Sequence, residues 1–477
     1  MKNLYELTIK EAAELLKKGE ISSFELVQSC LKQIKKVEPE IHAYITLNEE
    51  RALEQAKEID IRRKKHEKLS DLAGIPYSAK DVYCTKGLQT TAGSKVLEGY
   101  IPQYTATVIS KLNDVGAILL GKTNCDAFGF GTSTEHSGYG VTKNPIDTER
   151  VPGGSSGGSA AAVQYGGGLF SIAEDTGGSI RCPASFCGVA GLKVTYGRVS
   201  RYGAISYASS YDTVGPIAKN TEDLAMILEV IAGHDPHDAT SSNEKVQDYS
   251  KLLDRSIKGL KIGIPKEYFQ DGLDEEVKEI VEKAIEKYKS LGCEIKSISL
   301  PYTEYAIAAY YVVGLSEASA NLARFDGIRY GPQEKGENWM DIITSSRGKG
   351  FGEEEKRRIM IGTYALSAGY ADEFYKKAQK VRELIKNDLL RALKEVDIIL
   401  TPTMPVLPFK FGENDDDPLK MWLADAYTVT LNPSGLPGLS VNAGWSKDGL
   451  PVGMQLIGPH FREDLLLNFG HKYENEK

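Results

Sequence analysis

Val151-Pro-Gly-Gly-Ser-Ser-Gly-Gly-Ser159, followed by Asp175-Thr-Gly-Gly-Ser-Ile-Arg181, carries the clearest structural and chemical signal in this sequence. Both segments carry serines among glycines, and upstream Gly74-Ile-Pro-Tyr-Ser-Ala-Lys80 ends in a lysine. A serine hydroxyl becomes a good nucleophile once a base removes its proton, and glycines leave backbone N–H groups free to face a developing oxyanion. The three segments therefore predict acyl transfer by a serine that a lysine base serves.

The second segment predicts the nucleophile. Thr176, Gly177 and Gly178 come directly before Ser179, so their N–H groups are predicted to hold the oxyanion. The alternative is a glycine turn in which Ser179 only caps a helix that begins near Ile180.

The first segment predicts a second serine just before a helix. Ser155 lies among the glycines, and Ser159-Ala-Ala-Ala-Val163 continues the chain with helical composition. The phosphate-loop pattern G-x-x-x-x-G-K-[ST] is absent, which disfavours nucleotide binding.

Lys80 is the predicted base. A lysine accepts a proton only when it is neutral, and lowering its pKa from about 10.4 to about 7.5 requires roughly 4 kcal/mol. We expect Lys80 to end a buried strand, where burial would lower its pKa. The alternative is an ordinary lysine whose ammonium lies in water.

The composition excludes several classes of function. The chain has 477 residues, a net charge of −8 and no apolar run near the roughly 20 residues that a membrane span needs. The acidic charge opposes binding of nucleic acid by the chain's own field. The N-terminus lacks the apolar run of a secretory signal, so we expect a cytoplasmic protein. The six cysteines form no C-x-x-C pair and no zinc-spaced cluster, which predicts reduced thiols and no metal.

The hydrophobic pattern predicts an α/β protein with a mixed sheet. Apolar strands at 260–264 and 294–300 flank a helix over 275–291, an order typical of parallel strands. The Asp-Gly pair of Lys447-Asp-Gly449 predicts a hairpin turn before the strand at 451–457.

We expect a single domain over 1–477, because no repeat or low-complexity linker divides the chain. Its expected parts are an N-terminal helical region (1–68), a catalytic core with the glycine-serine segments (69–300), a helical lobe (301–395) and C-terminal strands that complete the sheet (396–477).

Lys80 and the two glycine-serine segments, in this order, resemble the amidase signature family. The resemblance implies one large mixed β-sheet covered by helices on both faces and a Ser-Ser-Lys catalytic set. It implies that Ser179 is the nucleophile and that Ser155, after a cis peptide bond from Gly154, relays the proton to Lys80.

Further segments resemble one subfamily, the A subunits of tRNA-dependent amidotransferases. The similarity runs from about residue 5 to beyond residue 460. The segments that carry it include Pro183-Ala-Ser-Phe-Cys-Gly188, Tyr196-Gly-Arg-Val-Ser-Arg-Tyr-Gly203 and Lys356-Arg-Arg-Ile-Met-Ile-Gly-Thr-Tyr364.

This resemblance implies a glutaminase within a carbon-nitrogen ligase that uses glutamine as amido donor. Ammonia would pass to a B subunit that amidates Glu-tRNA(Gln) or Asp-tRNA(Asn), with a small C subunit completing a heterotrimer. Charged tRNA would be held mainly by the B subunit. No cofactor is implied in this chain, whereas ATP and Mg are expected in the partner subunit.

Glutamine is a zwitterion, so its pocket needs a cation for the α-carboxylate and an anion for the α-amine. The resemblance places Arg358 and Asp425 in these roles and Tyr310 on the pocket wall. The alternatives are that Arg358 is a surface arginine beside Arg357, and that Asp425 caps the segment after it.

Three positions depart from the subfamily's pattern. Glu174 stands where a small residue usually precedes the aspartate, Cys182 where glutamine is usual and Val194 where proline is usual. None of them replaces a residue of the expected catalytic set.

Two alternative functions stay open at this point. The first is a stand-alone amidase that acts on small aliphatic or aryl amides. The second is a scaffold without catalysis.

Overall fold

The computed structural model describes residues 2–413 and 418–476, which form a mixed sheet of 11 strands in the order β1-β3-β2-β4-β6-β5-β10-β11-β9-β7-β8. The strands are β1 (Tyr44–Leu47), β2 (Pro76–Lys80), β3 (Ile118–Thr123), β4 (Phe170–Asp175), β5 (Ala190–Lys193), β6 (Thr213–Ala218), β7 (Lys261–Pro265), β8 (Glu294–Ile298), β9 (Ile398–Pro402), β10 (Gly438–Trp445) and β11 (Pro451–Ile457). The mixed sheet confirms the predicted fold class.

Helices connect most of these strands. The α-helices are α1 (Ile9–Lys18), α2 (Ser23–Ile41), α3 (Glu49–Lys64), α4 (Thr107–Asp114), α5 (Gly157–Tyr165), α6 (Arg181–Phe186), α7 (Thr221–Ile231), α8 (Glu275–Ser290), α9 (Ala306–Leu322), α10 (Trp339–Gly350), α11 (Glu353–Ala365), α12 (Lys377–Ala392), α13 (Pro418–Ala424), α14 (Leu431–Ser434) and α15 (Glu463–Asn475). None of the helices in the described ranges is long and apolar enough to cross a membrane.

Helices cover both faces of the sheet. Consecutive residues of a strand point to opposite faces, so helices that contact neighbouring positions of β10 and its paired strand β5 lie on opposite faces. A Cβ at Gly470 of α15 would contact Leu439 of β10 at 2.8 Å. A Cβ at Gly191, the β5 partner of Ser440, would contact Ala184 of α6 at 2.8 Å. The helices α15 and α6 therefore lie on opposite faces, as predicted.

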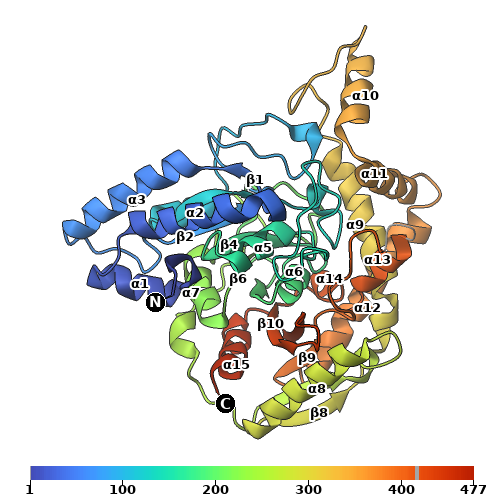
Figure 1. Cartoon of the computed structure of the whole chain (residues 1–477). Helices are drawn as coiled ribbons and strands as arrows, with labels where there is room; N and C mark the ends of the chain where they lie inside the picture. The colour runs from blue at the N-terminus through green and yellow to red at the C-terminus, as the bar shows by residue number, and fades with distance from the viewer. Residues whose placement is uncertain (1, 414–417, 477) are drawn as a thin grey trace.

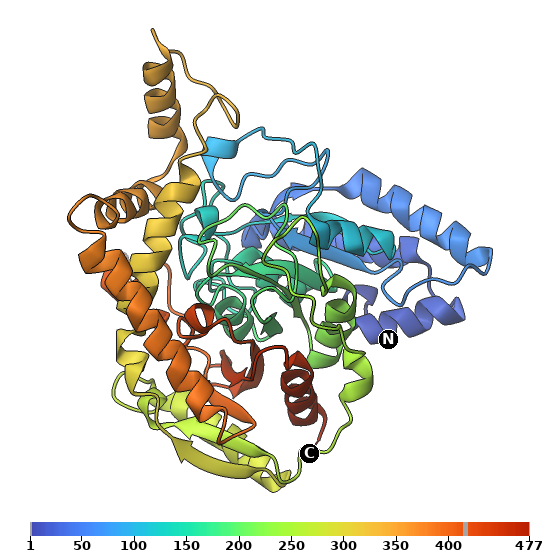
Figure 2. The same ribbon diagram turned by 180° about the vertical axis from the view of Figure 1, so that it is seen from behind.

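The two ends of the molecule differ in character. Helices α1 to α3 lie on one side of the sheet region, and the helical lobe of α9 to α12 lies on the other, in both views (Figures 1 and 2). The N-terminal helices begin where capping boxes place them, with Thr8 paired to Glu11 and Ser22 paired to Glu25. The region 1–68 also contains a strand, β1, which pairs antiparallel with β3 and which the helical pattern did not indicate.

The sheet register creates one functional edge. Strands β2 and β4 are parallel neighbours, with Ala79 opposite Ile172, so their carboxyl ends meet at the same edge. Strand β6 runs antiparallel to β4 with Thr213 opposite Asp175, so β6 begins where β4 ends. Side chains from three distant parts of the chain are therefore brought together at this edge.

Candidate active site

Lys80 is the last residue of β2, and its side chain is fully buried. Its Nζ donates a 2.7 Å hydrogen bond to Ser155 Oγ and a 2.9 Å hydrogen bond to Glu174 Oε2. The lysine therefore ends a buried strand, as predicted, and contacts one of the two predicted serines directly.

Ser155 lies in a turn that only glycines can build. The peptide bond between Gly154 and Ser155 is cis. A Cβ at Gly154 would lie 2.4 Å from Asp126 Oδ2 and 2.5 Å from the Ser133 nitrogen, so no larger residue fits there. The Asp126 N–H donates to the Ser155 carbonyl at 3.2 Å, which fixes the serine's backbone beneath the lysine.

Ser179 lies in the turn between β4 and α6, touching the first serine loop. The Ser156 N–H donates to the Ser179 carbonyl at 3.3 Å. Helix α6 begins at Arg181, and its N-cap residue is Ile180, without a side-chain cap bond. The Ser179 hydroxyl thus caps no helix, and no described residue hydrogen-bonds to it. The residue as a whole is 7% exposed.

The predicted oxyanion donors differ in their present bonding. The Gly178 N–H donates to Asp175 Oδ1 at 2.9 Å, so it is already engaged. The N–H groups of Thr176 and Gly177 have no acceptor within the described ranges. Thr428 Oγ1 donates to the Gly177 carbonyl at 2.7 Å, which orients this peptide. Two of the three predicted donors are thus free for a ligand.

A buried ion pair, which the sequence analysis missed, holds the Ser179 turn in shape. Arg181 donates through Nε and Nη2 to Asp175 at 3.1 and 3.0 Å, and both side chains are fully buried. Burial alone would raise the pKa of Asp175, but the charge and hydrogen bonds of Arg181 lower it to about 2. Since the unfolded pKa is about 3.9, this pair stabilises the fold above roughly pH 4 and loses that contribution as the pH falls toward 2.

Arg181→Ala is expected to lower the free energy of unfolding by about 3–5 kcal/mol, because it leaves a buried carboxylate unpaired. Guanidinium denaturation at pH 7, followed by circular dichroism, measures the loss. Arg357→Ala is the matched control, since that guanidinium is half-exposed and pairs with Glu354; it should cost less than about 1 kcal/mol. Equal denaturation midpoints for the two variants would contradict the role of the buried pair.

The pKa of Lys80 departs from the prediction. Burial is the largest single effect and lowers the pKa of Lys80, but the acidic groups around it, foremost Glu174 at 2.9 Å, together outweigh burial, and the pKa is raised above its ordinary value. The prediction of a lysine neutralised by burial alone is therefore wrong. Burial was the only cause of a pKa shift that the sequence around Lys80 indicated, because the carboxylate partner of Lys80 lies on another strand.

Arg358 points into the protein rather than into solvent. Its Nε donates to Glu354 at 2.7 Å and its Nη1 donates to the Tyr207 hydroxyl at 3.2 Å. The guanidinium also lies over the ring of Phe130, 5.1 Å from its centroid. Nη2 has no acceptor among the described residues. Arg358, and not the half-exposed Arg357, is therefore the arginine that faces the interior.

Asp425 is buried with one oxygen unused. Oδ2 accepts a 2.8 Å hydrogen bond from the Tyr311 hydroxyl, whereas Oδ1 has no partner in the described part of the chain. Burial raises the pKa of Asp425 to about 7, against the lowering effects of Tyr311 and Arg358. A buried carboxylate oxygen without a donor is costly, which indicates a site for a donor from a ligand.

Tyr310 joins this pocket to the Ser179 turn. A Cβ at Gly177 would lie 2.4 Å from Tyr310 Oη, so the tyrosine packs directly on the glycine of the turn. Its ring stacks on Tyr211 and meets Tyr311 edge-on. All three predicted pocket residues therefore contact the aromatic groups beside the serine loop.

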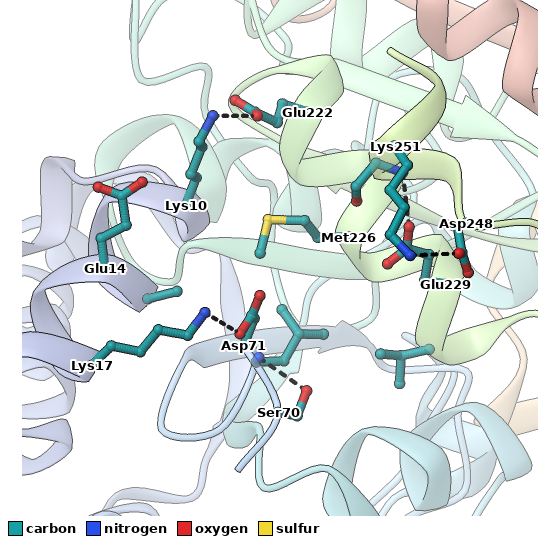
Figure 3. Close-up of a pocket in the computed structure, with 14 residues that line it drawn as sticks. Lys10, Glu14, Lys17, Ser70, Asp71, Glu222, Met226, Glu229, Asp248 and Lys251 are labelled. Carbon is teal, nitrogen blue, oxygen red and sulfur yellow. Dashed lines mark hydrogen bonds and ion pairs between the residues drawn. The ribbon is translucent and has the colours of Figure 1, made fainter. Parts of the chain in front are cut away.

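A separate cavity of about 490 Å³ lies between α1, α7 and the turn at residues 70–72 (Figure 3). Its charged side chains pair with one another, as in Lys10 with Glu222 and Lys17 with Asp71, each at 2.6 Å. None of the predicted site residues lines it. Such exposed ion pairs contribute about 0–1 kcal/mol each, and this cavity takes no part in the serine chemistry.

Comparison with known proteins identifies the family of this chain. The family model described as Amidase matches residues 25–467. The A subunit of glutamyl-tRNA(Gln) amidotransferase from Caldanaerobacter subterraneus is 54% identical, over 99% of this chain and 96% of that protein. The protein of the same name from Heliobacterium modesticaldum is 51% identical, over 99% and 97%.

Solved structures share the fold. The A subunit of glutamyl-tRNA(Gln) amidotransferase from Thermotoga maritima superposes with a TM-score of 0.82 at 40% identity, covering 98% of this chain and 94% of that one. A peptide amidase from Stenotrophomonas maltophilia superposes with a TM-score of 0.84 at 30% identity, covering 98% and 96%. The family model spans most of the chain and the relatives span nearly all of it, so the chain is an enzyme that belongs to the amidase family.

Proposed function

We propose that this chain is the glutamine-hydrolysing subunit of a tRNA-dependent amidotransferase. Ser179 attacks the side-chain amide, Ser155 carries the proton toward Lys80, and the free N–H groups of Thr176 and Gly177 hold the oxyanion. The ammonia released goes to a partner subunit, which uses ATP and Mg to amidate Glu-tRNA(Gln), Asp-tRNA(Asn) or both.

The observation that carries this proposal is the unpartnered Oδ1 of the buried Asp425, close enough to the buried guanidinium of Arg358 to feel its charge. The α-ammonium of glutamine supplies the missing donor, and the α-carboxylate takes the free Nη2 of Arg358. A neutral amide supplies neither charge. The pocket chemistry therefore favours a zwitterionic substrate over the small neutral amides of a stand-alone amidase.

An exposed apolar cluster on the helical lobe supports the proposal of a partner subunit. Tyr364, Tyr370 and Phe374 are 53%, 42% and 40% exposed, and their rings contact one another. Met360, one turn before Tyr364, is 72% exposed. Contiguous exposed apolar groups of this kind are typical of protein interfaces. The two relatives compared above are each named as one subunit of an amidotransferase, which agrees with this expectation.

The test is co-expression of this chain with B and C subunits, followed by assays of ammonia release. We expect a ternary complex to copurify and glutamine hydrolysis to rise when charged tRNA and ATP are present. Fast turnover of neutral amides by the isolated chain, with no response to the other subunits, would favour the stand-alone amidase instead.

The KM for glutamine is expected to fall by up to roughly tenfold as the pH rises from 6 to 8, because Asp425, with a pKa of about 7, binds the ammonium only when ionised. Asp425→Asn should raise the KM at pH 8 by at least roughly tenfold, the cost of one charged hydrogen bond, and abolish its pH dependence. Initial rates at pH 6, 7 and 8 measure both effects. A KM that stays constant over this range in the wild type would contradict the assignment of Asp425.

A further inference from the structure

The catalytic lysine has an acidic neighbour that the family resemblance did not provide. Lys80 Nζ contacts Ser155 Oγ at 2.7 Å and Glu174 Oε2 at 2.9 Å, and both charged side chains are buried. An ammonium has no lone pair, but the pair of ammonium and carboxylate takes up one further proton if the ammonium first gives a proton to the carboxylate. The lysine therefore does not have to be neutral in the resting enzyme.

Glu174 is itself linked to a second buried carboxyl. The Thr176 hydroxyl makes a short contact with Glu174 Oε1 and lies 2.7 Å from Asp212 Oδ1. A hydroxyl has one hydrogen, so it donates to only one of the two carboxyl groups. The other carboxyl must carry a proton and donate to Thr176 Oγ1. The geometry thus places a proton within the group formed by Glu174, Thr176 and Asp212, which we call the carboxyl cluster.

Asp212 is the member of the cluster that holds this proton. Burial, together with the charge of Glu174, raises the pKa of Asp212 to about 7. With Asp212 protonated, the hydrogen bonds run from Asp212 to Thr176 and from Thr176 to Glu174 Oε1. Glu174 Oε2 then accepts the hydrogen bond of Lys80 Nζ at 2.9 Å.

We propose that Glu174 extends the proton relay, acting through Lys80 as the final acceptor of the proton that leaves Ser179. This inference rests on the proposed role of Ser179 as nucleophile. It concerns a residue that stands where the subfamily usually has a small one.

The transfer balances at each atom. The Ser179 O–H bond breaks as its oxygen bonds to the amide carbon, and the proton moves to Ser155 Oγ, with which the Ser179 hydroxyl makes no hydrogen bond in the resting structure. Lys80 Nζ first passes a proton to Glu174 Oε2, and the lone pair freed on Nζ then accepts the proton of Ser155 Oγ. The pair changes from ammonium and carboxylate to ammonium and carboxylic acid. On collapse of the intermediate, the same path in reverse returns one proton to the leaving ammonia.

Among the titratable groups around the relay, Glu174 is the anion nearest to Lys80. Burial raises the pKa of Cys125 well above neutrality, so this thiol is uncharged. Asp126 accepts the backbone N–H groups of Thr134 and His136 and acts on Lys80 only as a weaker charge than Glu174. The remaining titratable side chains that face the cluster come from neighbouring segments and its adjoining cavity: Tyr83, Arg201, Tyr207, His237 and Asp238.

A cavity of about 260 Å³ reaches the cluster from outside. Glu174, Asp212, Ser206 and Arg201 are among the residues that line it. The carboxyl cluster therefore faces solvent on one side and the lysine on the other. A small carboxylate in solution has a route to the position of Glu174.

The test follows the rate at which phenylmethanesulfonyl fluoride modifies Ser179 in the full chain, from pH 5 to 10. This reaction reports proton removal from Ser179 without glutamine, so it separates the relay from the identity of the substrate. The wild-type rate is expected to level off above pH 7. In Glu174→Gln, only the amine accepts a proton. The rising limb of its rate–pH profile is expected at least one pH unit higher, so its modification rate at pH 6 is at least tenfold lower than that of the wild type.

The opposite shift would overturn the proposal. If Glu174 only stabilised the ammonium of Lys80, the wild-type rate would still climb above pH 9, and Glu174→Gln would move the limb to lower pH. An unchanged limb in the variant would also overturn it. Glu38→Gln, which alters a mostly buried glutamate that accepts hydrogen bonds from Tyr165, Ala43 and Tyr44, should leave the profile unchanged.

Chemical rescue supplies an independent readout. In Glu174→Ala, formate entering by the cavity is expected to restore the rate at pH 6 at least fivefold, whereas formamide is not. A purely structural role of Glu174 predicts no difference between the two additives. If neither variant folds, the wild-type profile alone tests the proposal, because the rate either levels off above pH 7 or still climbs above pH 9. Normal modification of Ser179 without any glutaminase activity would refute the proposed substrate and leave the relay standing.

Discussion

Ser179→Ala is expected to reduce glutamine hydrolysis by roughly 10⁴-fold or more while the complex with the partner subunits still assembles. The change deletes one hydroxyl that bonds to no described residue, so it removes the nucleophile and leaves the turn intact. The Asp175 and Arg181 pair, which shapes the turn, is untouched. Ammonia release from glutamine by the purified complex measures the loss.

The neighbouring serine provides the control. The Ser156 hydroxyl donates to the Glu174 carbonyl at 3.0 Å, and Ser156→Ala should cost about 1 kcal/mol of stability with activity within tenfold of the wild type. Glutaminase activity retained in Ser179→Ala would refute the assignment of the nucleophile.

Lys80→Ala is expected to be nearly as severe, and combining it with Ser179→Ala should add little. The reason is that the serine and its base act as a unit, so removing either one already disables the chemistry. The residual rate would come from the backbone N–H groups of Thr176 and Gly177 and from substrate binding. Single and double variants assayed side by side give the comparison.

Losses that multiply in the double variant would argue against a shared relay. Lys122→Met is a matched control, because Lys122 is equally buried but donates to Thr90 and the Tyr83 carbonyl instead. It is expected to lower the thermal midpoint and to retain most of the turnover. Inactivation equal to that of Lys80→Ala would show that burial of a lysine, rather than its contact with Ser155, is what matters.

The fold and the expected catalytic set were accessible from sequence because their signals are local. The strand before Lys80, the helix after Ser155 and the hairpin at Lys447-Asp-Gly449 each depend on neighbouring residues, and all three elements occur in the structure. The contact between Lys80 and Ser155 joins residues 75 positions apart, and only the family resemblance indicated it.

Sequence patterns could not predict the carboxyl cluster. Glu174 attracted notice only as a departure from the subfamily, and Asp212 gave no signal at all. Their meeting depends on the antiparallel register that sets Glu174 opposite Val214, one strand from Lys80. A carboxylate placed by that register is the foremost of the acidic groups that together raise the pKa of the lysine against the lowering effect of burial.

The separation of the sheet edge from the helical lobe bears on how such enzymes diversify. The groups that break the amide bond sit on strand ends and tight turns, whereas Tyr310 and Arg358 come from α9 and α11. Under the proposed roles, changing side chains of those two helices while keeping Tyr310 packed on Gly177 would retarget the enzyme and leave the relay residues in place. A directed-evolution library confined to the lobe is therefore a practical way to obtain hydrolases for new amides from this scaffold.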